Sequence, residues 1–266
     1  MSIILITGAT DGIGLESAQQ LAKLGHELVL HGRTEAKAAH ARTAVLEKSP
    51  AAKIYTAHAD LADLAEVVHM ANSLNTLLPR LDVQLNNAGV YMTARKVSRD
   101  GFEMTLAVNH LAHFLLTRLL LPLLKQSAEP RVVTVSSMVH TSGRIDFDNL
   151  NSERRFDSYD AYCNSKLANA LFAAELARRE PWLASNSLHP GVIDTKLLHA
   201  GIDMTGASAR SGAKTSVYLA TSPEAKGISG KYFDNCKITS PLVAVNDTRL
   251  AQQLWQWSEQ AIGNVL

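Results

Sequence analysis

Residues 7–14 read Thr7-Gly8-Ala9-Thr10-Asp11-Gly12-Ile13-Gly14, and they directly follow the apolar run Ile3-Ile4-Leu5-Ile6. Glycine at three of these positions allows a tight turn and lets the backbone come close to a ligand. The residues after the turn favour a helix, whose unpaired amides and partial positive charge suit a pyrophosphate. A glycine-rich turn alone could be only a turn, but between a first strand and a helix it indicates a dinucleotide site. The predicted contacts are Gly8, Thr10, Asp11, Gly12, Ile13 and Gly14.

Short β-type runs alternate with helical stretches along the whole chain. The predicted strands are Ile3–Thr7, Glu27–His31, Lys53–His58, Val83–Asn86, Arg131–Ser136, Asn186–His189 and Lys231–Phe233. The predicted helices lie near Gly14–Leu24, Glu35–Glu47, Leu64–Leu77, Gly101–Lys125, Tyr159–Arg179, Ser208–Ala220 and Asp247–Ile262. Such alternation predicts an α/β fold with helices on both faces of a parallel sheet. We expect a single Rossmann domain over residues 1–266, doubly wound around a mostly parallel, seven-stranded sheet.

The amino-acid composition limits the kinds of molecule that the protein is expected to bind. The 266 residues are 46% hydrophobic and 19% charged, enough for one large core, and a net charge of +1 creates no overall field that attracts nucleic acid. Two cysteines form no disulfide framework and favour a reducing cytoplasm. We see neither a signal peptide nor 18 uninterrupted apolar residues, so we expect no membrane span. A cytoplasmic protein acting on a small molecule is predicted.

The end of the second predicted strand bears on cofactor choice. It reads Leu30-His31-Gly32-Arg33. Sites specific for NAD place an acid near here, on the ribose 2′-hydroxyl. This chain has Gly32 there instead, with Arg33 beside it, and a guanidinium is a natural partner of a 2′-phosphate. NADP(H) is therefore preferred, with NAD(H) as the alternative if Arg33 is only a surface residue at the start of a helix.

Two further strand ends carry candidate cofactor contacts. Asp60-Leu61 follows the third strand, and Asn87-Ala88-Gly89 follows the fourth. Ligands of open α/β sheets bind at the carboxyl ends of the strands. Asp60 could accept a hydrogen bond from an adenine amino group or cap the next helix. The small residues Ala88 and Gly89 could let a cofactor cross the sheet edge or form an ordinary turn.

Tyr162 and Lys166 are candidates for proton transfer. They lie four residues apart in a predicted helix and therefore project from the same face. A phenol has a pKa of about 10, and a neighbouring ammonium favours the phenolate and lowers that value. The pair could thus act as a general acid/base. Alternatively, it is a packed tyrosine beside a solvated charge.

Other polar residues lie in the central helices and at the fifth strand. Asn109 is mildly unfavourable inside a helix, which suggests a specific role. His110 and His113 are three apart, but no third metal ligand follows at a suitable spacing, so we predict no metal site and interpret both as packed or exposed side chains. Ser136 and Ser137 end the fifth strand and place hydroxyls at the same sheet edge as the glycine turn.

Seven motifs in order make the chain similar to the short-chain dehydrogenases/reductases. They are Thr7–Gly14, Asp60-Leu61, Asn86–Gly89, Asn109, Ser136-Ser137, Tyr162-x-x-x-Lys166 and His189-Pro190-Gly191, and the similarity runs from residue 3 to about residue 195. The stretch from Ala161 to Asn169 most resembles the retinol dehydrogenase and WW-domain oxidoreductase branch. The family's activity implies hydride transfer between a nicotinamide and a carbonyl or alcohol.

The resemblance implies a role for each matching residue. Tyr162 would be the proton donor or acceptor, and Lys166 would lower its pKa and bind the nicotinamide ribose. Ser137, or Ser136 if the match is displaced by one, would hydrogen-bond the substrate oxygen. Asn109 would hold a water that links Lys166 to solvent. Thr195 would contact the nicotinamide carboxamide, and the residues before it, Pro190, Gly191 and Val192, would be further cofactor contacts.

The resemblance also frames the expected substrate and assembly. Residues 193–215 would form a substrate-binding segment, and an extra segment at about 141–155 would border the pocket. Apolar residues there and nearby indicate a hydrophobic ketone, aldehyde or alcohol: Met92, Val139, Leu197, Leu198 and Met204. Because the two longest helices often form the family's dimer contact, a homodimer or homotetramer is one expectation.

Two other functions stay open. A catalytically silent NADP-binding regulator would need the glycines but not the Asn-Ser-Tyr-Lys set. An enzyme of another class on this fold, such as an epimerase, would carry a larger C-terminal substrate domain than the roughly 70 residues that follow Thr195.

Overall fold

The computed structural model describes residues 1–201 and 205–263. Its centre is one sheet with the strand order β3-β2-β1-β4-β5-β6-β7-β8. The strands are β1 (Ile3–Ile6), β2 (Glu27–Gly32), β3 (Ile54–His58), β4 (Val83–Asn86), β5 (Arg131–Val135), β6 (Ala184–His189), β7 (Tyr232–Asp234) and β8 (Lys237–Thr239). The first seven run parallel, and β8 is antiparallel to β7. The predicted α/β class and parallel sheet are confirmed.

The eighth strand was not predicted. It is joined to β7 by Asn235 and Cys236, whose φ angles of 45° and 62° fit a two-residue hairpin turn. Cysteine is not a turn-forming residue, and all three residues of β8 are exposed, so neither the turn nor a buried face marks the strand in the sequence.

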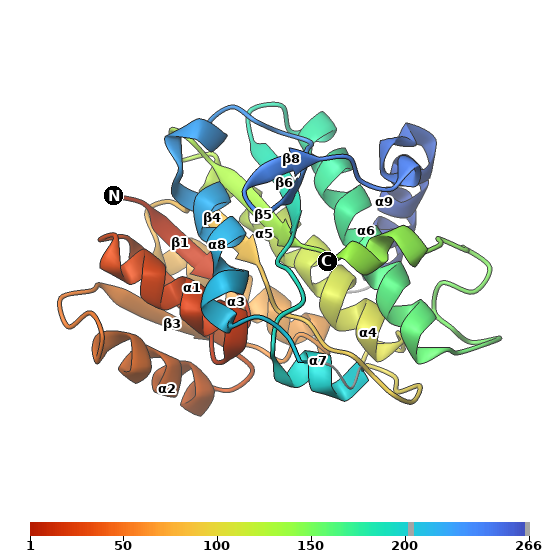
Figure 1. Ribbon diagram of the computed structural model, residues 1–266, viewed down its shortest axis with the longest axis horizontal. Helices are drawn as coiled ribbons and strands as arrows, with labels where there is room; N and C mark the ends of the chain where they lie inside the picture. The colour runs from red at the N-terminus through yellow and green to blue at the C-terminus, as the bar shows by residue number, and fades with distance from the viewer. Residues whose placement is uncertain (202–204, 264–266) are drawn as a thin grey trace.

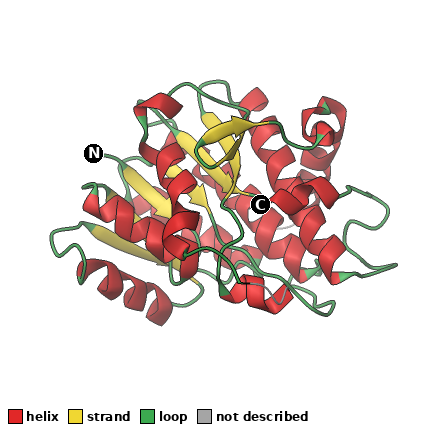
Figure 2. Cartoon of the chain, in the orientation of Figure 1, coloured by secondary structure: helices red, strands yellow, loops and turns green. Residues whose placement is uncertain are grey.

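Helices cover both faces of the sheet (Figures 1 and 2). In β1, Ile3 and Leu5 contribute to the core beneath α3, α5 and α6, while Ile4 and Ile6 contribute to the core beneath α1, α2 and α8. The helices are α1 (Gly12–Lys23), α2 (Glu35–Leu46), α3 (Leu64–Leu77), α4 (Met104–Leu106), α5 (Ala112–Leu124), α6 (Ser158–Arg179), α7 (Lys196–Gly201), α8 (Ala209–Thr221) and α9 (Thr248–Ile262).

The predicted helix Gly101–Lys125 begins later and is not regular. It starts at Met104, where the Glu103 carboxylate accepts the amides of Thr105 and Leu106. A π-helical turn over Ala107–Leu111 joins α4 to α5. By length and composition Met104–Leu124 could cross a membrane, but 78% of its apolar window is buried in the fold, as in the core helix of a globular domain. The π turn matters for the site because Asn109 lies in it.

The C-terminal helix α9 covers part of the helix pair α5–α6. Trp255 packs edge-on against Phe114, with ring centres 4.8 Å apart, and stacks on Phe172 at 6.0 Å. The Arg179 guanidinium lies 4.6 Å from the centre of the Trp255 ring. This tryptophan therefore packs within its own domain, on helices expected to carry a dimer contact.

Candidate active site

The glycine turn lies where the sheet reverses its winding. The next strands along the chain from β1 and β4 lie on opposite sides of this pair, so their carboxyl ends open a crevice. A Cβ on Gly14 would lie 2.2 Å from the Gly8 carbonyl oxygen and 2.6 Å from Asn87 Nδ2. Asn87 Nδ2 in turn donates to Thr7 O at 2.8 Å. Only glycine fits at position 14, and this close approach brings the first turn of α1 against the β4 exit.

The other predicted residues of the glycine turn face two neighbouring segments. Asp11 caps α1, accepting the Gly12 amide at 2.8 Å, and pairs with Lys196 of α7. Gly12 has φ +51°, and a Cβ on it would lie 3.3 Å from the Thr195 methyl group. The segment that carries Pro190, Gly191, Val192 and Thr195 thus lies against the turn. Thr10, Ile13 and Gly8 complete it, with Thr10 packed against Gly32 and Ile13 against Gly212.

The adenine-side predictions fall at the ends of β2 and β3. Arg33 is exposed, immediately before Thr34, the N-cap of α2. Asp60 does not cap the next helix, since Asp63 accepts the amides of Ala65 and Glu66. Instead, Asp60 Oδ1 accepts the Ala62 amide at 3.0 Å. The neighbouring Leu61 is buried in the core.

Tyr162, Lys166 and Ser137 meet at the end of β5. Lys166 Nζ lies 5.5 Å from the centre of the Tyr162 ring and donates to Val135 O at 3.3 Å. Ser136 is buried, and its hydroxyl donates to the Lys166 carbonyl at 2.7 Å. Ser137 is only half-buried and its hydroxyl faces Tyr162. The geometry therefore favours Ser137 over Ser136 as the hydroxyl available to a substrate.

Burial controls the protonation of this group. It raises the pKa of the Tyr162 phenol above its usual value, the Cys163 thiol adds to the rise, and the Ser137 hydroxyl opposes it. Burial also lowers the pKa of the Lys166 ammonium to about 8. The lowering of the Tyr162 pKa expected from Lys166 is not the dominant effect here. The raised pKa favours the protonated phenol, which is the form that a proton donor requires.

Asn109 ties the β4 exit to α6. Its Oδ1 accepts the Val90 amide at 2.8 Å, and its Nδ2 donates to Val90 O at 3.1 Å and to Ser165 Oγ at 3.0 Å. A Cβ on Gly89 would lie 3.5 Å from both Asn109 Oδ1 and Lys166 Nζ. Gly89, Asn109 and Lys166 therefore converge at one point, although they are far apart in sequence.

His113 joins this group to the glycine turn, a role that sequence analysis missed. Its Nδ1 lies 3.0 Å from the Asn109 carbonyl, which can only accept, so Nδ1 carries the proton. Its Nε2 then accepts the Thr7 hydroxyl at 2.9 Å. Thr7 Oγ1 accepts the amides of Asn87 and Ala88 at 2.9 and 3.0 Å. Burial lowers the His113 pKa to about 3, so the neutral ring persists.

His110 also turns out to be buried, with Nε2 2.9 Å from Ser258 Oγ. The only advance signal for His113 is its spacing, four residues after Asn109, which places both on one helix face. Over residues 1–201 and 205–263, no group of three His, Cys, Asp or Glu side chains is arranged to hold a metal ion.

Apolar side chains lie near the candidate catalytic residues. Half-buried Leu197 approaches to 3.6 Å of a Cβ placed on Gly89, and Met92, Val139 and Leu198 are also half-buried, while Met204 lies outside the described residues. Met138, Tyr159 and Val192 are exposed by 54%, 42% and 36%, and each neighbours a predicted site residue in the chain or on its helix face. The half-buried and exposed apolar groups give this edge a hydrophobic character.

Each of the two predicted substrate segments contains residues that are buried or belong to regular structure. In residues 193–215, Ile193 is buried and pairs with Ala207, and the last part belongs to α8. Residues 202–204 are not described. In residues 141–155, Asn151 Oδ1 accepts the Glu103 amide at 2.6 Å and Leu150 is buried. The extra segment is therefore anchored beside the start of α4.

Comparisons with known proteins agree with this arrangement. The family model for short chain dehydrogenase matches residues 2–205. Human retinol dehydrogenase 14 is 39% identical over 288 residues, which cover 98% of this chain and 86% of that protein. The crystal structure of an uncharacterized protein from Mycobacterium Paratuberculosis has a TM-score of 0.81 at 33% identity, covering 98% of this chain and 93% of that one. A short chain dehydrogenase from Escherichia coli CFT073 complexed with NADPH has a TM-score of 0.75 at 27% identity, covering 89% and 97%.

Proposed function

Because this chain belongs to the short-chain dehydrogenase/reductase family, in which the fold binds NAD(P)(H), we propose that it transfers hydride between NADP(H) and a hydrophobic ketone, aldehyde or alcohol. The observation that carries the proposal is the meeting of Tyr162, Lys166 and Ser137 at the sheet edge beside the glycine turn. The family and the curated relatives make the protein an oxidoreductase, and the substrate and the choice of cofactor are the proposed part.

The proposed reaction needs a hydride transfer and a proton transfer, and different groups serve each. When bound, the nicotinamide supplies or accepts the hydride. In carbonyl reduction, Ser137 donates a hydrogen bond to the developing alkoxide and Tyr162 gives it the phenol proton. The raised pKa favours the protonated form of Tyr162 that this direction requires, and it also makes the phenol a weaker acid than an unperturbed tyrosine. Lys166 would bind the nicotinamide ribose, and Asn109 would hold the β4 exit and α6 at the right separation.

The structure of the glycine turn fits a dinucleotide. Gly14 has no Cβ, and Gly8 and Gly12 have positive φ angles, so the backbone of the glycine turn passes close to the first turn of α1. The amides of that first turn have no partners within the helix and can bind a pyrophosphate. Asp60, Asn87, Ala88 and the Pro190–Thr195 segment would line the rest of the cofactor.

Arg33 would select the cofactor. Its guanidinium is exposed at the N-terminus of α2, where the helix also favours an anion, and no acid stands at Gly32. We expect Arg33→Ala to raise the Kd of NADPH by about 10- to 100-fold, the worth of a charge-assisted hydrogen bond, and to leave NADH unchanged. Fluorescence titration of both cofactors measures this.

Arg42→Ala is the matched control, because Arg42 is an exposed arginine of α2 that lies away from the helix N-terminus, whereas Arg33 directly precedes the N-cap. Equal losses for NADPH and NADH in Arg33→Ala, or wild-type NADPH affinity, would contradict the assignment.

The substrate is proposed from the apolar edge and from the relatives. Exposed Met138, Tyr159 and Val192 beside the site favour a hydrophobic compound over a sugar or an acid. A relative named retinol dehydrogenase supports including retinal and retinol in a panel of aldehydes, ketones and alcohols. NADPH-dependent turnover of hydrophobic carbonyls would support the proposal, whereas tight NADPH binding without turnover of any compound would favour the silent regulator.

The remaining predictions concern cellular context. A cytoplasmic location still rests on the two cysteines, Cys163 and Cys236, which form no disulfide with each other. A homodimer or homotetramer remains a prediction from the family. A contact through α5 and α6 would have to form around Trp255 and the rest of α9.

A further inference from the structure

Tyr232 in β7 contacts the backbone of Ser137, the serine that is proposed to bind the substrate oxygen. Its hydroxyl donates to the Ser137 carbonyl at 3.0 Å, although the two residues are far apart in the chain. Tyr232 is only 5% exposed, and burial raises the pKa of its phenol, so it remains a donor across the working pH range. Tyr232 belongs to none of the sequence motifs described above.

The same carbonyl is held by His140. The His140 amide lies 3.1 Å and its Nδ1 2.7 Å from Ser137 O. Because a carbonyl only accepts, Nδ1 carries the proton, and Nε2 accepts the Leu242 amide at 3.0 Å. The His140 and Tyr232 rings also contact each other, with centres 4.5 Å apart. Three donors thus converge on one carbonyl.

The next peptide group is held as well. The Met138 amide donates to His189 Nδ1 at 3.1 Å. Ser137 itself is extended, with φ −165° and ψ 158°, before a 3₁₀ turn over Met138–Ser142. Fixing the carbonyl and the following amide restrains the Ser137 backbone, and the Ser137 hydroxyl accepts the Val139 amide at 3.4 Å, which orients the side chain. The hydroxyl faces Tyr162.

We propose that Tyr232 is a positioning residue, whose hydroxyl acts with His140 to hold the Ser137 backbone so that the Ser137 hydroxyl stays aligned with Tyr162. This inference rests on the proposed function, in which Ser137 binds the substrate oxygen. It identifies a contribution to the site from the seventh strand, which the recognised motifs do not reach.

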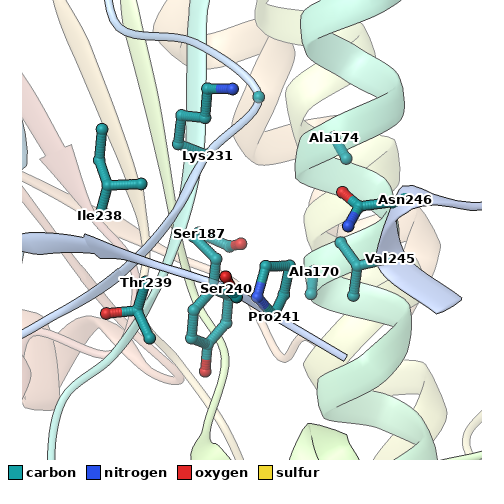
Figure 3. Close-up of a pocket in the computed structure, with 12 residues that line it drawn as sticks. Ala170, Ala174, Ser187, Lys231, Ile238, Thr239, Ser240, Pro241, Val245 and Asn246 are labelled. Carbon is teal, nitrogen blue, oxygen red and sulfur yellow. The ribbon is translucent and has the colours of Figure 1, made fainter. Parts of the chain in front are cut away.

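Tyr232 also lines a cavity. The cavity has a volume of about 230 Å³ and is lined by Tyr232, by α6 and by the β7–β8 hairpin with the loop after it. Figure 3 shows Ala170 and Ala174 of α6 on one side of it, and Ile238 and Thr239 of β8 on the other. The hydrogen bond to the Ser137 carbonyl and the ring contact with His140 hold the Tyr232 side chain where this residue borders the cavity.

Tyr232→Phe tests this by removing one oxygen while keeping the ring. We expect kcat to fall ~3- to 10-fold, the usual worth of one hydrogen bond, with NADPH Kd and the melting temperature near wild type. Tyr218→Phe is the matched control. Tyr218 packs on Phe233, the next residue of the same strand, at 6.3 Å, and does not touch Ser137. It should leave kcat unchanged.

A double mutant separates positioning from general packing. Ser137→Ala should itself lower kcat by ~10²- to 10³-fold. If Tyr232 acts through the Ser137 hydroxyl, adding Tyr232→Phe should cause no further loss. Wild-type kcat in Tyr232→Phe would overturn the inference, as would a fully additive loss or a parallel loss of NADPH affinity and stability. A wild-type protein without turnover would overturn the proposed function, and this inference with it.

Discussion

Tyr162→Phe is expected to abolish measurable carbonyl reduction while leaving the fold and NADPH binding intact. The substitution removes the only proton that the proposed mechanism gives to the alkoxide, and general acid catalysis contributes about 10²- to 10⁴-fold. The ring itself stays, so its contact with Tyr91, at 5.4 Å between ring centres, is kept. Single-turnover kinetics with NADPH and an active aldehyde or ketone would measure the loss.

Tyr91→Phe is the matched control for this experiment. Tyr91 adjoins Tyr162, but its hydroxyl donates to Ser158 Oγ at 3.1 Å and has no assigned part in proton transfer. We expect it to keep most of the turnover. Turnover close to wild type in Tyr162→Phe would rule out the phenol as the acid, and a loss of NADPH affinity in that variant would show that the oxygen serves binding instead.

The fold was predictable because its signals are local. The strands β1, β2 and β5 each contain a buried apolar run. Several helices start at side chains that accept amides, such as Asp63, Ser208 and Asp247. The π turn was not predictable, because Ala107–Leu111 contains neither glycine nor proline and its residues are compatible with a regular helix. The hairpin to β8 was not predictable, because Cys236 adopts a positive φ and cysteine is not typical of such turns.

The site was predictable only where a motif fixes residues by spacing. Tyr162 and Lys166 share a helix, so their proximity follows from geometry alone. His113, His140 and Tyr232 each have a partner far away in the chain, namely Thr7, Leu242 and Ser137. Only the spacing of His113 from Asn109 is a local signal. The sequence also suggested that Lys166 would dominate the Tyr162 pKa, but the burial of both groups depends on β5, α5 and α6 packing together. Desolvation of that kind is a property of the fold.

Lys166→Met is expected to destroy turnover and yet to stabilise the protein. Lys166 is 3% exposed, and burial lowers the pKa of its ammonium from 10.5 to about 8. The folded state therefore holds the charge at a cost of ~3 kcal/mol relative to the unfolded chain. Methionine has a similar length and no charge, so it removes that cost. The Val135 carbonyl keeps a partner, since Asn169 Nδ2 lies 3.2 Å away.

The pH dependence identifies the cause. Below pH 8 both folded and unfolded chains carry the Lys166 proton, so the wild type bears the full cost and the variant should be more stable by about 3 kcal/mol. Between pH 8 and 10.5 the folded lysine is neutral while the unfolded one is still charged, so the difference shrinks. Above pH 10.5 both are neutral and it should vanish. Urea unfolding at pH 7 and pH 11 measures both limits.

Lys23→Met serves as the control, because Lys23 is exposed on α1 and its replacement should change the free energy of unfolding by less than about 0.5 kcal/mol. If Lys166→Met were destabilising at pH 7, the lysine would be part of the structural core and its burial would need no functional reason. A gain in stability together with a loss of turnover would show instead that the buried charge of Lys166 destabilises the fold and is present because the proposed chemistry requires it.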